Sequence, residues 1–417
     1  MIDHAGAVAG AGARPARLPS LTGLRAVLAL AVVLCHVATV LRPAYGSAAA
    51  RADAQWAMVL GPAAVSAFFV LSGFVLTWSH RPGDRARAFW RRRFWKIFPA
   101  HALAWAVAVA CCGLAAVPAA GGAPDRHATA VAAAHLLLVQ NWAPGTGVMA
   151  FNVPDWSISC EAFFYALFPA LVAAVRRTPA ARLPRAWAAL AAAVLALPLA
   201  SLPFGGPHLV PGLALNETAL WFCYLLPPVR LAEFALGAVT ARLVLAGAWP
   251  RVPRALTAAT PVIAMAATLV LPPQYGLAAA WAPPAALIIA DLAGGDARGR
   301  HGLLARPAPV ALGDASYSLY ITHFPLLGLC LHLIGPGRAL PPWTAAPIGA
   351  GLVLLAQAAA LLVHRCYEEP IMRRWSRPRR PAPASRTTPP ARPAPARAVP
   401  EPGPRLAAAP AAAEEPS

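Results

Sequence analysis

Runs of about 20 mostly apolar residues recur along most of this chain, and they constrain its fold more than any other feature. A helix of that length spans a hydrocarbon core about 30 Å thick. We place ten such runs at 21–41, 57–79, 97–118, 157–175, 186–204, 217–241, 255–271, 275–292, 315–335 and 344–365. The sequence therefore predicts an all-α, polytopic transmembrane bundle of about ten helices.

The composition agrees with a membrane protein. The 417 residues are 59% hydrophobic and 12% charged, whereas soluble domains carry about 25% charged residues. The seven cysteines lie in or beside apolar runs and form no C-x-x-C pair. We therefore expect neither a disulfide framework nor a metal site.

The formal net charge of +19 follows the predicted topology. Arginines concentrate in every second connection, and cytoplasmic loops of membrane proteins carry such an excess. The even-numbered connections hold Arg81 to Lys96, Arg176 to Arg185, Arg242 to Arg254 and Arg298 to Arg306, and the odd ones hold only Arg42, Arg51, Arg126 and Arg338. This alternation predicts that both termini are cytoplasmic, and it explains the basic excess without a nucleic-acid partner.

Three segments organise the chain. Residues 1–17 are expected to form a flexible basic N-terminus, and residues 18–376 the transmembrane domain. From 377 to 417 the chain is rich in Pro, Ala and Arg, a composition that buries too little apolar surface to fold, so a disordered cytoplasmic tail is expected. The external connection 119–155 contains "AAAHLLLVQNW", which is too short to span and is expected to form a surface or re-entrant helix.

The first predicted helix contains an arginine and a histidine. Arg25 and His36 are eleven positions apart, which is three helical turns plus about 20° and a rise of about 16 Å. They therefore share one face of the helix. Charged and ionisable groups inside a membrane are costly and are functional candidates by default. A cytoplasmic flank for Arg25 and a packing role for His36 would explain the same spacing.

Two further stretches contain candidate functional residues, one within the second predicted span and one just before the third. In "FFVLSGFVLT", Ser72 and Gly73 are small residues that permit close helix approach. In "RRRFWKIFPAH", Arg91, Arg92, Arg93 and Lys96 precede the third span. These cations could bind a polyanionic donor such as coenzyme A, or they could anchor the helix to the cytoplasmic surface.

The fourth span begins with "PDWSISCEAFFYALFP". Ser157, Glu161 and Tyr165 recur every four residues, so they share a helix face. A carboxylate there could orient an imidazole or accept a hydrogen bond from a sugar hydroxyl. A purely structural pairing is the alternative.

Two later spans carry further polar groups. Arg230 and Glu233 stand at i,i+3 after a Pro-Pro pair that can break the helix, and an ion pair within the bundle is the expected role. The stretch "ASYSLYITHFPLL" contributes a second intramembrane histidine, His323, beside Tyr320.

These stretches together resemble the acyltransferase 3 family of integral membrane O-acyltransferases. The family pattern starts with an arginine and a histidine in the first helix, continues through an "FFVLSGF" second helix and a basic cluster, and closes with "Y-E-P". The matching positions after the basic cluster are Trp156, Ser157, Glu161, Phe164, Tyr165, Arg230, Glu233, Phe234, Gly237, Ser316, Tyr317, Tyr320, His323, Pro325, Tyr367, Glu369 and Pro370. They follow in order over residues 18–375.

The resemblance implies transfer of an acyl group, commonly acetyl, from cytoplasmic acyl-CoA to a hydroxyl of a saccharide or glycosylated metabolite at the plasma membrane. Acyl-CoA would be a co-substrate, with no bound cofactor. His36 is expected to be the general base, with Arg25 and Glu161 also catalytic. The remaining assignments are Arg93, Lys96 and Arg92 for donor binding, and Trp156, Ser157, Tyr165, Ser72, Arg230, Glu233, Tyr320 and His323 for acceptor binding or support. His323 is also the rival base.

The chain departs from the family pattern at three points. The usual pair of arginines before the third helix is Arg93 with Lys96 here, which keeps the charge and loses one bidentate group. A carboxylate often follows the Glu161 position, which here is followed by Ala162. The chain resembles the stand-alone form, without an extracytoplasmic hydrolase-like domain.

Two other functional classes fit part of the pattern. A transporter or flippase for a polar saccharide would also bury Arg, His and Glu along its passage. A membrane sensor or scaffold would need no histidine at position 36. Hydrolysis of acyl-CoA by the purified protein separates an acyltransferase from both.

Overall fold

The computed structural model describes residues 17–41, 59–81, 83–114, 126–145, 147, 149–207, 215–334, 340–376 and 403. The chain divides into two units, Met1–Arg377 and Pro378–Ser417, and the first is described below. The expected flexible N-terminus of 1–17 and the expected tail of 377–417 lie outside the described residues, apart from Arg17 and Gly403. Both therefore stay predictions.

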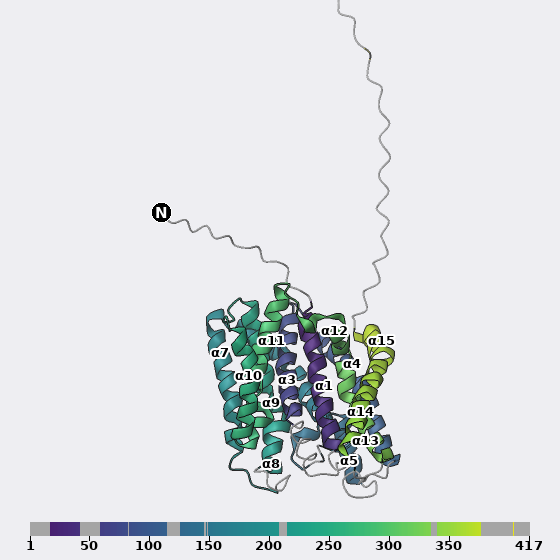
Figure 1. Ribbon diagram of the computed structural model, residues 1–417. Helices are drawn as coiled ribbons and strands as arrows, with labels where there is room; N and C mark the ends of the chain where they lie inside the picture. Colours follow the sequence, from purple (N-terminus) through teal and green to yellow (C-terminus); the bar gives the residue numbers. More distant parts are fainter. Residues whose placement is uncertain are drawn as a thin grey trace, which may run out of the picture. The chain divides into compact units, whose positions relative to one another are not determined.

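The described residues form a helical bundle without a β-strand (Figure 1). The longer helices are α1 (Pro19–Leu41), α3 (Leu60–Ser79), α4 (Ala86–Leu114), α5 (Arg126–Leu136), α6 (Asp155–Arg177), α7 (Leu183–Ala196), α9 (Pro227–Leu245), α10 (Arg254–Val270), α11 (Ala282–Ala297), α12 (Pro307–Asp314), α13 (Ser316–Ile334) and α14 (Pro342–Val363). Short helical turns lie between them: η2 (Gln140–Trp142), η3 (Ala180–Arg182), η4 (Leu197–Ser201), α8 (Glu217–Leu220), η5 (Trp221–Leu225), η6 (Tyr275–Ala279) and η7 (Leu303–Ala305). Three more follow α14 and continue the last helix: η8 (His364–Glu368), α15 (Glu369–Ile371) and η9 (Met372–Ser376).

The all-α membrane fold is confirmed. Within the described part, eight helical segments are long and apolar enough to cross a membrane. The other two predicted positions are occupied by α10, which has 17 residues, and by α13, which has 19. The count of ten spans and the cytoplasmic position of both termini stay predictions.

Two helix boundaries differ from the expected ones. α4 begins at Ala86, eleven residues before the predicted span, so the basic cluster belongs to the helix itself. The last helical segment continues from Trp343 to Ser376. In both cases charged residues extend an apolar helix beyond the hydrocarbon-length run, because helical hydrogen bonding does not require apolar side chains.

The sixth predicted span is interrupted as its Pro-Pro pair suggested. The π-helical turn η5 ends at Leu225, and Leu226 has an extended backbone with ψ 116°. α9 then starts at Pro227, where a missing N–H and a fixed φ suit the first turn of a helix.

α3 and α9 cross with their backbones in close contact. A Cβ atom added to Gly73 would overlap the carbonyl oxygen of Phe234, and one added to Gly237 would overlap that of Val70. Gly73 therefore has the role that its size suggested, since small residues let helix backbones approach.

α1 is surrounded by other helices. It packs against α3, α12, α13 and α14, and Figure 1 shows it beside α3 in the middle of the view. At its N-terminal end the carboxylate of Asp296 accepts hydrogen bonds from the backbone N–H of Ser20 at 2.8 Å and from its hydroxyl at 2.6 Å. A carboxylate at a helix N-terminus satisfies free N–H groups and suits the helix dipole.

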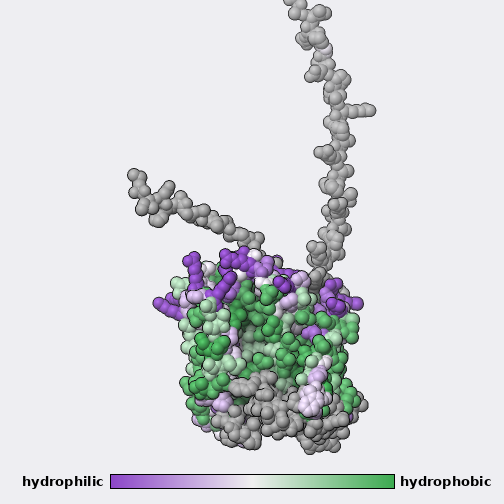
Figure 2. Space-filling view, viewed as in Figure 1, coloured by the Kyte–Doolittle hydropathy of each residue, from purple (hydrophilic) through white to green (hydrophobic). Residues whose placement is uncertain are grey.

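Hydrophilic side chains gather at the end of the bundle where α12 lies, and the sides in view are mainly hydrophobic (Figure 2). Arg81, Arg182, Arg251 and Arg300 are exposed in the connections that the arginine alternation assigns to the cytoplasm. This distribution is the one expected of a bundle whose sides face lipid.

The connection after α4 folds back onto the bundle. α5 packs beside α4, where the indole Nε1–H of Trp105 donates to the carbonyl of Ala132 at 3.0 Å. Beyond it, Gln140 and Asn141 are buried. The side-chain amide of Asn141 donates to the carbonyl oxygens of Trp156 at 2.6 Å and Leu225 at 2.9 Å. This segment therefore braces the start of α6 against η5.

Candidate active site

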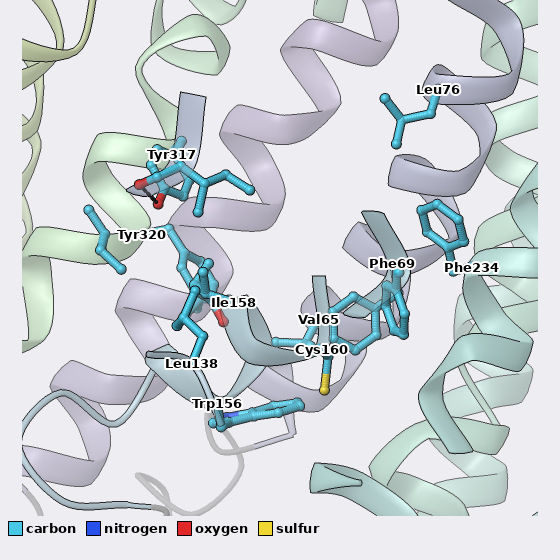
Figure 3. Packing of buried hydrophobic residues seen from close by; sticks show 14 of the residues in the cluster. Val65, Phe69, Leu76, Leu138, Trp156, Ile158, Cys160, Phe234, Tyr317 and Tyr320 are labelled. Carbon is cyan, nitrogen blue, oxygen red and sulfur yellow. Dashed lines mark hydrogen bonds between the residues drawn. The ribbon is translucent and has the colours of Figure 1, made fainter. Parts of the chain in front are cut away.

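A cavity of about 160 Å³ lies between α1, α3, α4, α6 and α13. Four of its lining residues are labelled in Figure 3, with Tyr317 and Tyr320 on the left of the view and Phe69 and Leu76 on the right. Eight predicted site residues line this cavity: Arg25, Ser72, Arg93, Lys96, Ser157, Glu161, Tyr165 and Tyr320. The structure thus brings together residues that are up to 295 positions apart in the sequence (Arg25 and Tyr320).

The cavity has an excess of positive charge. Arg25, Arg93 and Lys96 line it together, and Glu161 is the one carboxylate among its described lining residues. Arg25 comes from the second turn of α1, and the other two come from one face of α4. Such a group of cations in a partly apolar cavity is suited to an anionic ligand.

The two neighbouring arginines of α4 have different surroundings. Arg93 lies 5.8 Å from the Phe89 ring and 5.9 Å from the Tyr165 ring, and its buried Nε has no hydrogen-bond partner among the described residues. Arg92 does not line the cavity, and its Nη2 lies 3.8 Å from Asp84 Oδ1. Adjacent helix positions differ by about 100° in direction, which separates the two guanidinium groups.

A hydrogen-bonded row of three side chains lies on the α6 side of the cavity. The hydroxyl of Tyr165 donates to Glu161 Oε2 at 3.0 Å, and the Ser72 hydroxyl lies 3.3 Å from the same tyrosine oxygen. Because the tyrosine proton points to the carboxylate, Ser72 is the donor in the second bond. Glu161 is thereby held in place within the cavity.

Ser157 and Tyr320 form the opposite end of the polar lining. Their hydroxyl oxygens are 2.6 Å apart, and Ser157 also donates to the carbonyl of Pro154 at 3.0 Å. The Tyr320 hydroxyl is therefore the donor in the shared bond. The Tyr320 ring also contacts the rings of Phe68, at 6.0 Å, and His323, at 6.3 Å.

His36 and His323 do not line the cavity. They contact each other, with His36 Nδ1 and His323 Nε2 2.8 Å apart. His323 is fully buried, whereas His36 is partly exposed. Arg25 and His36 share a face of α1 as predicted, yet only Arg25 lines the cavity. Tyr320 does line the cavity, and its ring lies 6.3 Å from the ring of His323.

Trp156, Arg230 and Glu233 form a separate buried group. The predicted ion pair is present, with Arg230 Nη2 3.0 Å from Glu233 Oε2. The guanidinium group lies 5.0 Å from the Phe69 ring and 6.0 Å from the Trp156 ring. These residues pack behind the wall of the cavity and support it.

The sequence analysis did not identify Glu368, which is a buried carboxylate. Glu368 accepts hydrogen bonds from Lys96 and from the Ser318 hydroxyl at 2.5 Å. The residue matched to the family pattern was Glu369, which forms an exposed pair with Arg373 at 2.7 Å. Lys96 therefore already has a counter-ion, which leaves Arg25 and Arg93 as the cavity cations without an ion pair among the described residues. The i,i+4 spacing of His364 and Glu368 was the available sequence signal.

A second missed cluster is buried where α5 meets α4 and α6. His101 Nδ1 lies 3.8 Å from Asp155 Oδ2, and the Asn152 amide donates to Asp155 Oδ1 at 2.7 Å. Burial lowers the pKa of His135, whose neutral ring donates from Nε2 to the carbonyl of Gly147 at 3.0 Å. This cluster holds the connection before α6 against the bundle. No group of three or more metal-ligating side chains occurs among the described residues.

Comparisons with known proteins identify the family of the chain. The family described as "Acyltransferase domain" (acyltransferase 3) matches residues 18–361. The chain belongs to the acyltransferase 3 family. It is 40% identical over 382 residues to "Acyltransferase MdmB" of Streptomyces mycarofaciens, an alignment that covers 88% of this chain and 95% of that protein. No solved structure matches the chain significantly.

The expected family is thus confirmed, and the chain is an acyltransferase and a multi-pass membrane protein. The family match covers every residue that lines the cavity, because these lie between positions 25 and 320. Glu368 lies beyond the matched range.

Proposed function

We propose that this acyltransferase moves an acyl group, acetyl in the simplest case, from cytoplasmic acyl-CoA to a hydroxyl of a saccharide or glycosylated metabolite. The observation that carries the proposal is the cavity between α1, α4 and α6, which Arg25 and Arg93 both line without an ion-pair partner among the described residues. Membership of the family supplies the reaction class.

The donor side of the proposal rests on charge. Coenzyme A carries phosphate groups, for which arginine is a preferred partner because its planar guanidinium donates two parallel hydrogen bonds. Arg25 and Arg93 would bind these phosphates. Lys96 would contribute less to donor binding, since the ion pair with Glu368 already neutralises its charge.

The acceptor side rests on His36. A neutral imidazole close to the acceptor hydroxyl would remove its proton as the oxygen attacks the thioester carbonyl carbon. The new C–O bond forms, the C–S bond breaks, and the proton returns to the sulfur of the leaving group. The hydroxyl row of Ser72, Tyr165 and Glu161 would bind sugar hydroxyls or polarise the reacting groups.

The partners and the compartment follow from this reaction. The enzyme would lie in the plasma membrane, take acyl-CoA from the cytoplasm, and use no bound cofactor. Surface polysaccharides, lipid-linked saccharides and macrolide antibiotics are the acceptor classes that the family resemblance suggested.

Acyl transfer by the purified protein tests the proposal. The protein in detergent or nanodiscs is given radiolabelled acetyl-CoA with and without candidate glycosylated acceptors, and mass spectrometry compares glycans, glycolipids and secreted metabolites from cells with and without the gene. His36→Ala should lower kcat by about 10²–10⁴, the usual contribution of a general base. Full turnover by His36→Ala at equal membrane levels would contradict the assignment of the base, and absence of any acylated product would contradict the reaction.

A further inference from the structure

The two intramembrane histidines form one hydrogen-bonded unit. His36 Nδ1 of α1 and His323 Nε2 of α13 are 2.8 Å apart, and the rings stack at 24° with centroids 5.0 Å apart. The two residues are separated by 287 positions in the sequence, so only the packing of α1 against α13 creates the pair.

The hydrogen bonds of His323 determine which nitrogen of each ring carries a proton. His323 Nδ1 lies 2.9 Å from the carbonyl oxygen of Leu319, one turn earlier in α13. A carbonyl oxygen only accepts, so the proton of a neutral His323 is on Nδ1 and its Nε2 has a lone pair. The bond between the histidines is therefore donated by His36 Nδ1. It follows that the lone pair of a neutral His36 is on Nε2.

The two rings also differ in accessibility. His323 has no exposed surface, and both of its nitrogens have partners. His36 is partly exposed. Of the two histidines, only His36 can meet a substrate, so His323 is no longer a rival base in this geometry.

We propose that His323 is the positioning residue for the base. By accepting the Nδ1–H of His36 it fixes the tautomer and the ring orientation and directs the Nε2 lone pair to the acceptor hydroxyl. When Nε2 takes the hydroxyl proton, His36 becomes an imidazolium ion and its bond to His323 becomes charge-assisted and stronger. The inference deepens the proposed function and rests on it.

The choice of an imidazole for this role has a physical reason. In soluble hydrolases a buried carboxylate orients the catalytic histidine. A carboxylate inside a membrane carries a charge at a cost of several kcal/mol, whereas a neutral imidazole supplies an acceptor without that charge. His323 in turn is oriented by a backbone carbonyl, which α13 supplies at i−4.

Three single variants test the proposal by steady-state kinetics at matched membrane levels. His323→Leu removes the acceptor and should lower kcat by about 10- to 100-fold with little change in either KM, because a hydrogen bond to a group that becomes charged is lost. His323→Gln should recover much of this loss, since its amide oxygen can accept from His36. Phe324→Leu is the matched control, because the Phe324 ring touches the His36 ring at 5.2 Å without a hydrogen bond, and it should stay within about twofold of the wild type.

The double variant separates positioning from a general packing role. If His323 acts through His36, adding His323→Leu to His36→Ala should cause no further loss of kcat. If the losses of kcat in the two single variants multiply in the double variant, or if His323→Leu turns over at the wild-type rate, the inference is overturned. The acyltransferase proposal stays intact in both cases. An inactive His323→Leu beside a fully active His36→Ala would show that His323 is itself the base.

Discussion

At the scale of single residues, neighbouring positions of one helix have different roles because their side chains point in different directions. Arg93 lines the cavity with a buried Nε that has no partner among the described residues, whereas Arg92 pairs with Asp84 near the surface. Glu368 is buried against Lys96, whereas Glu369 pairs with Arg373 in an exposed position. The role of a charged residue here thus depends more on the direction of its side chain from the helix than on its charge.

The two arginines give a matched test of donor binding. Arg93→Gln should raise the KM for acyl-CoA by about tenfold or more and leave the acceptor KM nearly unchanged, because a charge-assisted bond to phosphate is lost. Arg92→Gln removes the same charge one position away and should change either KM by less than about twofold. Kinetics with both substrates varied will measure these values. Equal effects of the two substitutions would indicate that the cluster only anchors α4.

At the scale of helices, the crossing of α3 and α9 positions one wall of the cavity. α3 carries Ser72 and Phe69 into the lining, and the adjacent Gly73 permits contact with the backbone of α9 at Phe234. Because Ser72 contacts Tyr165 at 3.3 Å, we expect a shift of α3 relative to α9 to change this contact. Helix contact and site geometry are therefore coupled through one turn of α3.

This crossing can be tested with two glycine substitutions. Gly73→Ala places a methyl group against the Phe234 carbonyl and should lower stability by about 1–3 kcal/mol, the typical cost of overpacking. Gly328→Ala in α13 is the control, because its added Cβ would have no atom within 4 Å among the described residues, its own turn of helix aside, and it should be neutral or slightly stabilising. Thermal unfolding in detergent gives the comparison. A Gly73→Ala protein as stable as the Gly328→Ala protein would contradict the close crossing.

At the scale of the whole molecule, the bundle has a polar end and apolar sides (Figure 2). The arginine alternation assigns the polar end to the cytoplasm. Arg25 and Arg93 lie toward the helix ends that begin there, since α1 begins at Pro19 and α4 at Ala86. A donor from the cytoplasm would therefore reach these cations first, and His36 lies about 16 Å further along α1.

Cysteine labelling in intact cells tests this orientation. An impermeant maleimide should label Met149→Cys from outside, because this position is 41% exposed in the connection assigned to the external face. It should fail to label Arg182→Cys unless the membrane is opened. The wild-type protein, whose Cys366 is exposed on the side assigned to the cytoplasm, provides the background. The reverse labelling pattern would refute the predicted topology.

The sequence by itself determined the fold class and the family. Long apolar runs leave a chain in lipid little choice other than helices, so the helical membrane fold followed from local composition. Patterns within single helices, such as the i,i+3 pair of Arg230 and Glu233 or the shared face of Ser157, Glu161 and Tyr165, were also predictable because helical periodicity is local.

The tertiary structure decided which of these faces meet. Arg25 and His36 share a face of α1, yet only Arg25 lines the cavity. The contact of His36 with His323 joins two residues that are 287 positions apart in the sequence, on α1 and α13. Glu368 is buried and Glu369 is not, because adjacent positions of a helix differ by about 100° in direction and packing decides which of the two faces the bundle. Periodicity fixes relative directions within a helix, whereas its rotation and neighbours are set by packing against the rest of the bundle.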